Sequence, residues 1–595
     1  MALLGTASRL LPDASATLTG RGRRPLLTPV VAPIVRNALR RAMRMMGHAF
    51  IVGESIESAL ARGRRDHDLS LCSFDVLGEG ARSESDAQQY FAAYERAIDA
   101  LRSQPADSVH RRSGISVKLS ALEPRYSLTQ HARVMESLVP RMRSLARRAC
   151  AAGIGLTIDA EEADRLDLSL DIIAALASDA GTRAWGGLGL AVQAYGRRAP
   201  LVLDWVAELA RSTSRKMTVR LVKGAYWDAE VKRAQERGLD SFPVYTSKAA
   251  TDAGYLVCAQ RLFAARDVIY PQFATHNAMT VAAVLATAPR GAVYEFQRLH
   301  GMGQALYEAV RADTPELPPI RVYAPVGTHE ELLPYLVRRL LENGANTSFV
   351  HHFLNRDIPV EKVVGRIMGQ VIPDSATAAK TTASGAASGA GSPPRIREPR
   401  MLYRSRHNSR GADFGDPTEL AALQGELSSA AGISYSGGPL LSDGEAIDPS
   451  VPVRSPADAA KIVGLTRDAT EAEIAGAMSA CARAQRGWDA TPAGQRAACL
   501  EKAADLLESR RGLFLHLLVR EAGKTLPDAI AEIREAVDFC RYYASRGREL
   551  FSAPQELDGP VGERNLLSFQ GRGVFACISP WNFPLAIFTG QITAA

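Results

Sequence analysis

Eight strand-like runs, each followed by a helix-like segment, constrain this chain more than any other feature. They are SLCSFDVLG (70–78), GISVKLSAL (114–122), IGLTIDAEE (154–162), LGLAVQAY (188–195), MTVRLVKG (217–224), PQFATHNA (271–278), AVYEFQRLH (292–300) and PIRVYAPVG (319–327). Parallel strands that are buried on both faces have largely apolar sequences, and the helical segments between them supply the crossovers. Eight such units between residues 70 and 343 predict an α/β fold with a (β/α)8 barrel.

Each predicted strand carries polar side chains near its end. They are Asp75, Glu79, Lys118, Asp159, Gln193, Arg220, Lys223, His276, Asn277, Glu295, Gln297 and Tyr323. In a barrel the carboxyl ends of all strands meet at one face, so these side chains are expected to form one site. No GxGxxG fingerprint follows any of the strands, so a cofactor here would be held by side chains and barrel loops.

Composition narrows the function classes. The chain has 595 residues and a net charge of +7, with cations scattered among acids, which argues against a nucleic-acid site. Its seven cysteines form no CxxC pair, so neither a disulfide framework nor a metal site is predicted, and a cytoplasmic location is favoured. No apolar stretch of about 18 residues predicts a spanning helix.

Five regions are expected along the chain. Residues 1–30 are interpreted as a disordered leader, with a transit-like leader as the alternative that their Arg-rich composition leaves open. Residues 31–66 form a predicted helical arm, with Leu39, Met43, Met46 and Phe50 as a packing stripe. The barrel is placed at 67–372. Residues 373–398 are predicted to be a flexible linker because they contain almost no large apolar side chains, and 399–595 form a second domain.

The run TVRLVKGAYWD (218–228) combines a predicted buried strand with two cations, a glycine and two aromatic residues, which is typical of a strand that ends at a ligand site. Arg220 and Lys223 are costly in an apolar strand unless an anion or polar ligand meets them, and Gly224 allows close approach to the backbone. Together with GISVKLSALEPRY, TIDAEEADRL, FATHNA, EFQRLHGMG, YAPVG and LVRRLLENGANTSF, this run resembles the proline dehydrogenase family. The resemblance covers residues 37–370, in the form that bifunctional proline utilization A proteins fuse to an aldehyde dehydrogenase.

The resemblance implies FAD as the cofactor, with Arg220 donating near flavin N5. The other residues that it assigns to the FAD site are Gln193, Lys223, Gly224, Ala225, Trp227, Thr246, Thr251, His276, Asn277 and Glu342. Cations and donors suit a diphosphate, and a hydrogen bond near N5 suits the reduced ring. By itself, Trp227 is equally well interpreted as a residue that packs a helix on the barrel.

The resemblance also implies a substrate site, in which Arg338, Arg339 and Lys118 bind the carboxylate of L-proline. Tyr323, Tyr226 and Leu299 are then expected to surround the pyrrolidine ring, with Asp159 orienting the polar network. Glu79 is expected to pair with Arg338 when no substrate is bound. By spacing alone, Arg338 and Arg339 are also interpreted as helix-surface partners of Glu342.

The reaction so implied is hydride transfer from proline C5 to the flavin, which yields pyrroline-5-carboxylate. The family resemblance suggests a membrane quinone as the electron acceptor and a peripheral position at the inner membrane. Two alternatives remain: another FAD-dependent barrel, such as a methylenetetrahydrofolate reductase, or a non-catalytic regulatory relative. The expected clamp of Lys118, Arg338 and Arg339 favours an amino-acid substrate over a folate.

Residues 452–595 resemble the N-terminal part of an aldehyde dehydrogenase, through PVRSPAD and GRGVFACISPWNFPLAIFTGQITAA. The resemblance assigns Asn582 to an oxyanion hole, although a turn asparagine is the simpler interpretation of this residue alone. GVFACI is predicted to be the first strand of an NAD-binding sheet, with Cys577 as a buried thiol. Without neighbouring strands, it is expected to expose apolar surface and unpaired backbone groups. The family's later glycine motif, general-base glutamate and nucleophilic cysteine are not found, so this domain is expected to be incomplete and without NAD-dependent activity.

Overall fold

The computed structural model describes residues 51–78, 80–103, 108–314, 316–328, 396–441 and 448–595. Eight parallel strands close into a barrel in sequential order, and β1 pairs with both β2 and β8. The strands are β1 (Cys72–Val76), β2 (Gly114–Val117), β3 (Leu156–Ile158), β4 (Leu188–Gln193), β5 (Met217–Val222), β6 (Ile269–Ala274), β7 (Glu295–Leu299) and β8 (Ile320–Val326). The predicted barrel and all eight of its strands are confirmed.

A helix precedes β1, and the other helices connect successive strands and cover the outside of the barrel. They are α3 (Ile56–Gly63), α4 (Glu84–Leu101), α5 (His131–Ala152), α6 (Leu166–Ala177), α7 (Ala199–Ser212), α8 (Trp227–Arg237), α9 (Lys248–Ala264), α10 (Ala278–Thr287) and α11 (Gln304–Asp313). Ser83 and Asp86 form a capping box that fixes the start of α4. Helix α3 lies at the end of the predicted arm, whereas the stripe from Leu39 to Phe50 lies outside the described residues.

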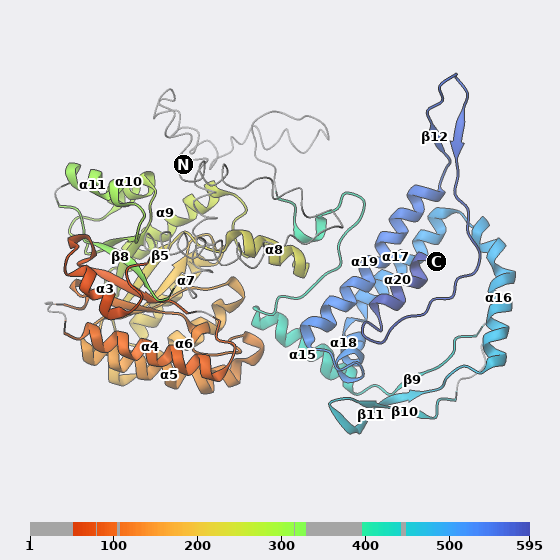
Figure 1. Cartoon of the computed structure of the whole chain (residues 1–595), viewed down its shortest axis with the longest axis horizontal. Helices are drawn as coiled ribbons and strands as arrows, with labels where there is room; N and C mark the ends of the chain where they lie inside the picture. Colours follow the sequence, from red (N-terminus) through yellow and green to blue (C-terminus); the bar gives the residue numbers. More distant parts are fainter. Residues whose placement is uncertain (1–50, 79, 104–107, 315, 329–395, 442–447) are drawn as a thin grey trace, which may run out of the picture.

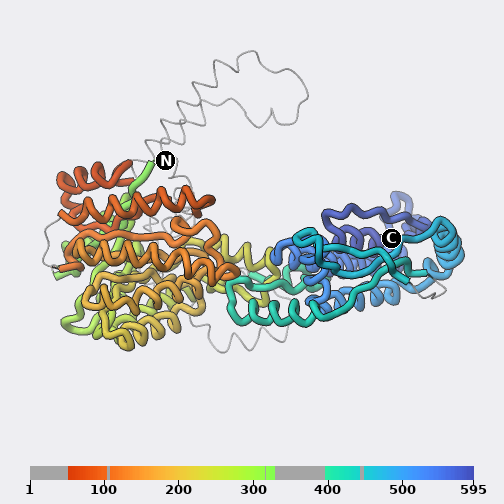
Figure 2. Tube along the Cα trace, turned by 90° about the horizontal axis from the view of Figure 1, so that it is seen from below, coloured from red at the N-terminus to blue at the C-terminus, as the bar shows by residue number. Residues whose placement is uncertain are grey.

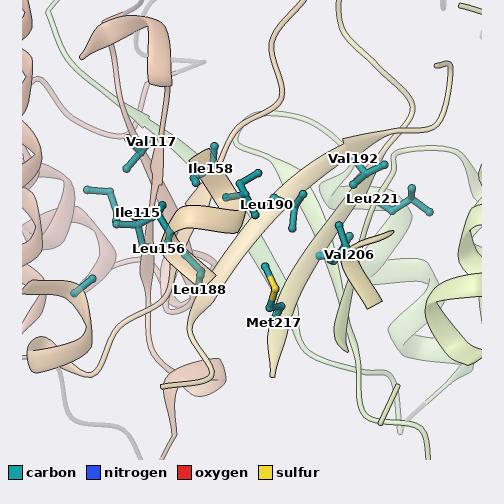
Figure 3. Packing of buried hydrophobic residues seen from close by; sticks show 14 of the residues in the cluster. Ile115, Val117, Leu156, Ile158, Leu188, Leu190, Val192, Val206, Met217 and Leu221 are labelled. Carbon is teal, nitrogen blue, oxygen red and sulfur yellow. The ribbon is translucent and has the colours of Figure 1, made fainter. Parts of the chain in front are cut away.

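The hydrophobic core of the barrel lies between its strands and its helices. Residues such as Ile115, Ile158 and Leu190 belong to one buried cluster with Val206 of α7 and other helix residues (Figure 3). Side chains alternate across a strand, so the intervening positions face the barrel interior. Those interior positions include buried polar residues, namely Ser73, Asp75, Ser116, Lys118, Arg220, Gln272, Glu295, Gln297 and Arg321.

The second part of the chain is mainly helical. Its elements are α15 (Pro417–Ala431), β9 (Tyr435–Gly437), β10 (Val451–Ser455), β11 (Asp458–Thr466), α16 (Glu471–Ala490), α17 (Ala493–Ser509), α18 (Arg511–Arg520), α19 (Leu526–Phe551), β12 (Gln555–Leu557), β13 (Asn565–Leu567) and α20 (Ala586–Ala594). Leu515, Ile533 and Val537 belong to its buried core. None of the helices that the structure describes is both long and apolar enough to cross a bilayer.

One predicted strand is wrong. Residues 574–578, the centre of the expected GVFACI strand, have no regular secondary structure, and Val574, Phe575 and Ile578 are exposed. Cys577 is half-buried instead of buried. No strand in the described part of the chain pairs with this segment, and an apolar run without a pairing partner does not form a strand.

The two parts of the chain touch beside α8, within an elongated molecule (Figures 1 and 2). The Gly411 N–H donates to the carbonyl of Gly238 at 2.9 Å. Arg410 pairs with Asp240 at 3.2 Å, and Arg534 donates to the carbonyl of Glu236. The segment that follows the predicted linker is therefore docked on the barrel.

Candidate active site at the carboxyl ends of the strands

Asp159, directly after β3, is the centre of the candidate site. One of its oxygens accepts from the Tyr323 hydroxyl at 2.6 Å and from Lys118 Nζ at 3.3 Å, and the other accepts from Arg220 Nη1 at 2.7 Å. Lys118 also pairs with Asp75. These five side chains come from β1, β2, β3, β5 and β8 or from the residues that directly follow them, so barrel closure is what brings them together.

Arg220 is held from several sides. Its Nη2 donates to the hydroxyls of Ser73 at 2.8 Å and Ser116 at 2.9 Å, and its Nε donates to Gln297 Oε1 at 2.7 Å. The guanidinium carbon lies 5.0 Å from the centre of the Tyr323 ring. These contacts fix the plane of the guanidinium group. Ser73 and Ser116 are absent from the sequence prediction, although their two-residue spacing from Asp75 and Lys118 places them on the same strand faces.

Neighbouring charges and burial together shift the pKa values of Asp159, Lys118 and Tyr323. Burial favours the neutral form of Asp159, but Lys118 and Arg220 outweigh it and hold the pKa of Asp159 below its ordinary value. Burial also disfavours the Lys118 cation, yet Asp75 and the neighbouring groups raise the pKa of Lys118 well above its ordinary value. Burial, followed by the charge of Asp159, raises the pKa of Tyr323 well above its ordinary value. At neutral pH the cluster therefore contains a carboxylate, two cations and a protonated phenol.

The predicted cofactor residues Gln193, Lys223 and Gly224 lie at the ends of β4 and β5. Gln193 Nε2 donates to the carbonyl of Glu161 at 2.7 Å, and its Oε1 accepts from the Ala225 N–H at 3.4 Å. Lys223 pairs with Asp252 and stays partly exposed. The backbone of Gly224 has a φ of +131° and crosses closely over the Tyr195 ring. These residues border one rim of the barrel mouth.

His276 and Asn277 follow β6 on the same side of the barrel. His276 Nε2 accepts from the Leu299 N–H at 2.9 Å, and Asn277 caps α10 by accepting from the Thr280 N–H at 3.0 Å. Both residues are half-buried, as is Leu299 at the end of β7. Their polar atoms already have protein partners, which orient them at the mouth.

The remaining predicted site residues lie in or near α8 and α9, or outside the described residues. Trp227 Nε1 donates to the carbonyl of Tyr245 at 2.8 Å, and its ring packs on the Tyr195 and Phe242 cluster, as in its packing interpretation. Tyr226 directly precedes α8, Thr251 is buried in α9, and Thr246 is exposed. Glu79, Arg338, Arg339 and Glu342 lie outside the described residues.

A cavity of about 700 Å³ adjoins this site. Asp159 and Gln193 from the strand ends, Glu230 from α8, and Arg410 and Asp416 from the second part all line it. Burial is the main cause that raises the pKa of Glu230 to about 7. Within the described residues, no group of three or more His, Cys, Asp or Glu side chains is arranged to hold a metal ion.

Both parts of the chain match known protein families. Residues 59–352 match the proline dehydrogenase family, and residues 443–595 match the aldehyde dehydrogenase family. The chain is 44% identical to bifunctional protein PutA of Klebsiella aerogenes, over 99% of this chain and 44% of that protein. It is 46% identical to bifunctional protein PutA of Escherichia coli K12, over 95% of this chain and 42% of that protein. The chain thus spans less than half the length of these relatives.

Solved structures of proline utilization A are also similar to this chain. A variant of proline utilization A from Bradyrhizobium japonicum is 46% identical, with a TM-score of 0.76, over 97% of this chain and 56% of that chain. Proline utilization A from Bdellovibrio bacteriovorus, inactivated by N-propargylglycine, is 30% identical, with a TM-score of 0.78, over 94% of this chain and 58% of that chain.

Proposed function

We propose, from the premise that residues 59–352 form a domain of the proline dehydrogenase family, that this barrel oxidises L-proline to pyrroline-5-carboxylate with FAD. The observation that carries the proposal is the buried cluster of Lys118, Asp159, Arg220 and Tyr323 at the strand ends. It combines a cation for the substrate carboxylate with a rigid guanidinium group for the cofactor.

The residues at the mouth fit FAD. Arg220 and Lys223 supply positive charge, and α8, which has 11 residues, directs its N-terminus toward the same rim. Gly224 is half-buried at this rim, and the Tyr195 ring fills the position that a Cβ would occupy. Gln193, Lys223, His276 and Asn277 would therefore hold the cofactor, and Arg220 would face its ring. When bound, FAD supplies a two-electron acceptor for the hydride that leaves proline C5.

The chain's own contribution is positioning. Lys118, together with Arg338 and Arg339, would bind the carboxylate, while Asp159 and Tyr323 hold the Lys118 ammonium group in place. Tyr323, Tyr226 and Leu299 would enclose the ring and exclude water. Holding the donor carbon near the acceptor converts an encounter into a pre-oriented reaction.

The remaining assignments rest on the resemblance. We propose a quinone as the electron acceptor, with the protein cytoplasmic and peripheral at the inner membrane. NAD is proposed for a complete aldehyde dehydrogenase domain. Residues 443–595 alone are proposed to form no NADH from glutamate semialdehyde, because 574–578 forms no sheet on which a dinucleotide binds.

The test uses the purified full chain with FAD, an artificial electron acceptor, and either L-proline or methylenetetrahydrofolate. We expect reduction with L-proline alone, and Lys118→Met should raise the KM for proline by roughly ten- to a hundredfold, because a charge-assisted hydrogen bond is lost. Lys216→Met, an exposed lysine before β5, is the matched control. Activity with the folate alone would favour the second barrel function, and absence of flavin binding would favour the non-catalytic alternative.

A further inference from the structure

A column of four buried polar side chains runs through the barrel interior beneath the candidate site. Arg220 Nε donates to Gln297 Oε1 at 2.7 Å, and Gln297 Nε2 donates to Glu295 Oε1 at 2.9 Å. Arg321 donates to the two oxygens of Glu295 at 2.6 and 3.0 Å. The exposed fractions are 3% for Arg220, 1% for Gln297, 0% for Glu295 and 4% for Arg321.

Glu295 determines which end of the Gln297 amide faces Arg220. Both oxygens of Glu295 accept hydrogen bonds, one of them from the NH2 end of the Gln297 amide, so the carbonyl end of this amide faces Arg220. The opposite orientation would place NH2 donors against a guanidinium group that has no acceptor. Arg321 donates to both oxygens of Glu295 and supplies the countercharge for this carboxylate in the barrel interior.

The Arg220 guanidinium is oriented from two directions. Nη1 and Nη2 meet Asp159, Ser73 and Ser116 toward β1, β2 and β3, whereas Nε meets Gln297 on β7. Gln297 therefore fixes the rotation of the group on the side opposite to the serines. Without this acceptor, the buried Nε–H would lose its partner, and the guanidinium group would be held from the side of Asp159, Ser73 and Ser116 alone.

We propose that Glu295 is a positioning residue for the oxidation: through Gln297, it holds the Arg220 guanidinium in the plane that faces the cofactor. The inference rests on the proposed function, because that function gives Arg220 its role beside the flavin. Glu295 and Gln297 then orient Arg220, in addition to the pairing of Glu295 with Arg321. A cation fixed at the flavin stabilises the reduced ring, so the column should set the flavin potential.

The test is a double-mutant cycle on the FAD-loaded full chain, with Glu295→Gln, Gln297→Met and the double variant. The readout is the FAD midpoint potential in a dithionite titration, which needs no turnover. Each single variant should lower the potential by about 30 mV, which corresponds to a tenfold weaker preference for the reduced flavin. The double variant should match Gln297→Met, because Glu295 acts through Gln297.

Kinetics and a control separate positioning from general stability. Both single variants should slow flavin reduction by proline roughly tenfold while leaving the KM for proline near the wild-type value. Tyr270→Phe is the matched control, because the Tyr270 hydroxyl meets the other oxygen of Glu295 at 3.3 Å and does not touch Gln297. This variant should keep the wild-type potential.

A Glu295→Gln protein with reduced thermal stability and an unchanged potential would overturn the proposal, as would additive shifts in the double variant. If Glu295→Gln does not fold, Glu295→Gln/Arg321→Gln removes both charges together and takes its place in the cycle. If FAD binds but proline does not reduce it, the proposed function fails, whereas the titration still decides the role of Glu295.

Discussion

Individual side chains in this barrel depend on partners that are distant in sequence. Asp159 accepts from groups on β2, β5 and β8, and its charge is tolerated only because two cations accompany it. Removing one member of a buried ion pair leaves an uncompensated charge, which typically costs about 3–5 kcal/mol. The charge of Asp159 therefore depends on the positions of Lys118 and Arg220.

Glu230 gives a pH-dependent prediction at the residue scale. Burial raises its pKa from 4.5 to about 7, so between these values the folded protein binds more protons than the unfolded chain, and stability falls as pH rises. Glu230→Gln removes this loss and keeps an acceptor for the Ala163 N–H, which lies 2.8 Å away. We expect the variant to be more stable than wild type above pH 7, by roughly 1–3 kcal/mol.

Denaturant unfolding at pH 4.5 and pH 8 checks this expectation. The advantage of Glu230→Gln should shrink toward the lower pH. Glu208→Gln, on the exposed face of α7, is the control and should show no such pH-dependent difference. A stability difference that is the same at both pH values would contradict the burial argument.

At the scale of elements, the connection from β5 to α8 depends on Gly224. Its φ is +131°, and a Cβ at this position would lie 2.5 Å from the Tyr195 ring. Gly224→Ala should therefore destabilise the barrel by roughly 1–3 kcal/mol and weaken FAD retention. Gly425→Ala is the control: it lies inside α15 with no atom within 4 Å of the added Cβ, and should stabilise by about 0.5–1 kcal/mol. Thermal unfolding and flavin content are measured for both variants. A melting temperature of Gly224→Ala equal to that of the wild type would refute the steric argument.

The barrel strands and part of the candidate site can be predicted from the sequence. The eight barrel strands are predictable because their outward positions form apolar runs, and Lys118, Asp159, Arg220 and Tyr323 are conspicuous as polar residues within or beside such runs. Ser73 and Ser116 are not predictable as partners of Arg220, since a serine in a strand is unremarkable until barrel closure shows what it faces. GVFACI fails for a related reason: a strand exists only with a neighbour.

At the scale of the whole molecule, the predicted linker suggests two independent units, whereas the structure docks residues 408–416 against α8 and its neighbouring loop. A Cβ at Gly411 would lie 1.6 Å from the Arg237 carbonyl, so Gly411→Ala should loosen this docking. We expect amide hydrogen exchange at the end of α8 to rise tenfold or more, equivalent to about 1.4 kcal/mol. Proline oxidation should change by no more than a few fold, because the Asp159 cluster lies within the barrel.

Hydrogen-exchange mass spectrometry of the full chain, with Gly425→Ala as the control, measures this effect. Unchanged exchange in Gly411→Ala would show that the docking contributes nothing to the stability of α8.

The hydrogen bonds that four strands make to Arg220 affect the kinetics of folding. Its hydrogen-bond partners come from β1, β2, β3 and β7, and Ser73 lies 147 positions away in the chain. Until all of these strands are in place, a half-assembled barrel carries a cation whose acceptors are missing, so intermediates gain little from burying it. Contacts of such long sequence separation form slowly. Refolding should accordingly proceed through a collapsed state whose outer apolar layer precedes the polar interior, which is completed in one late, cooperative step.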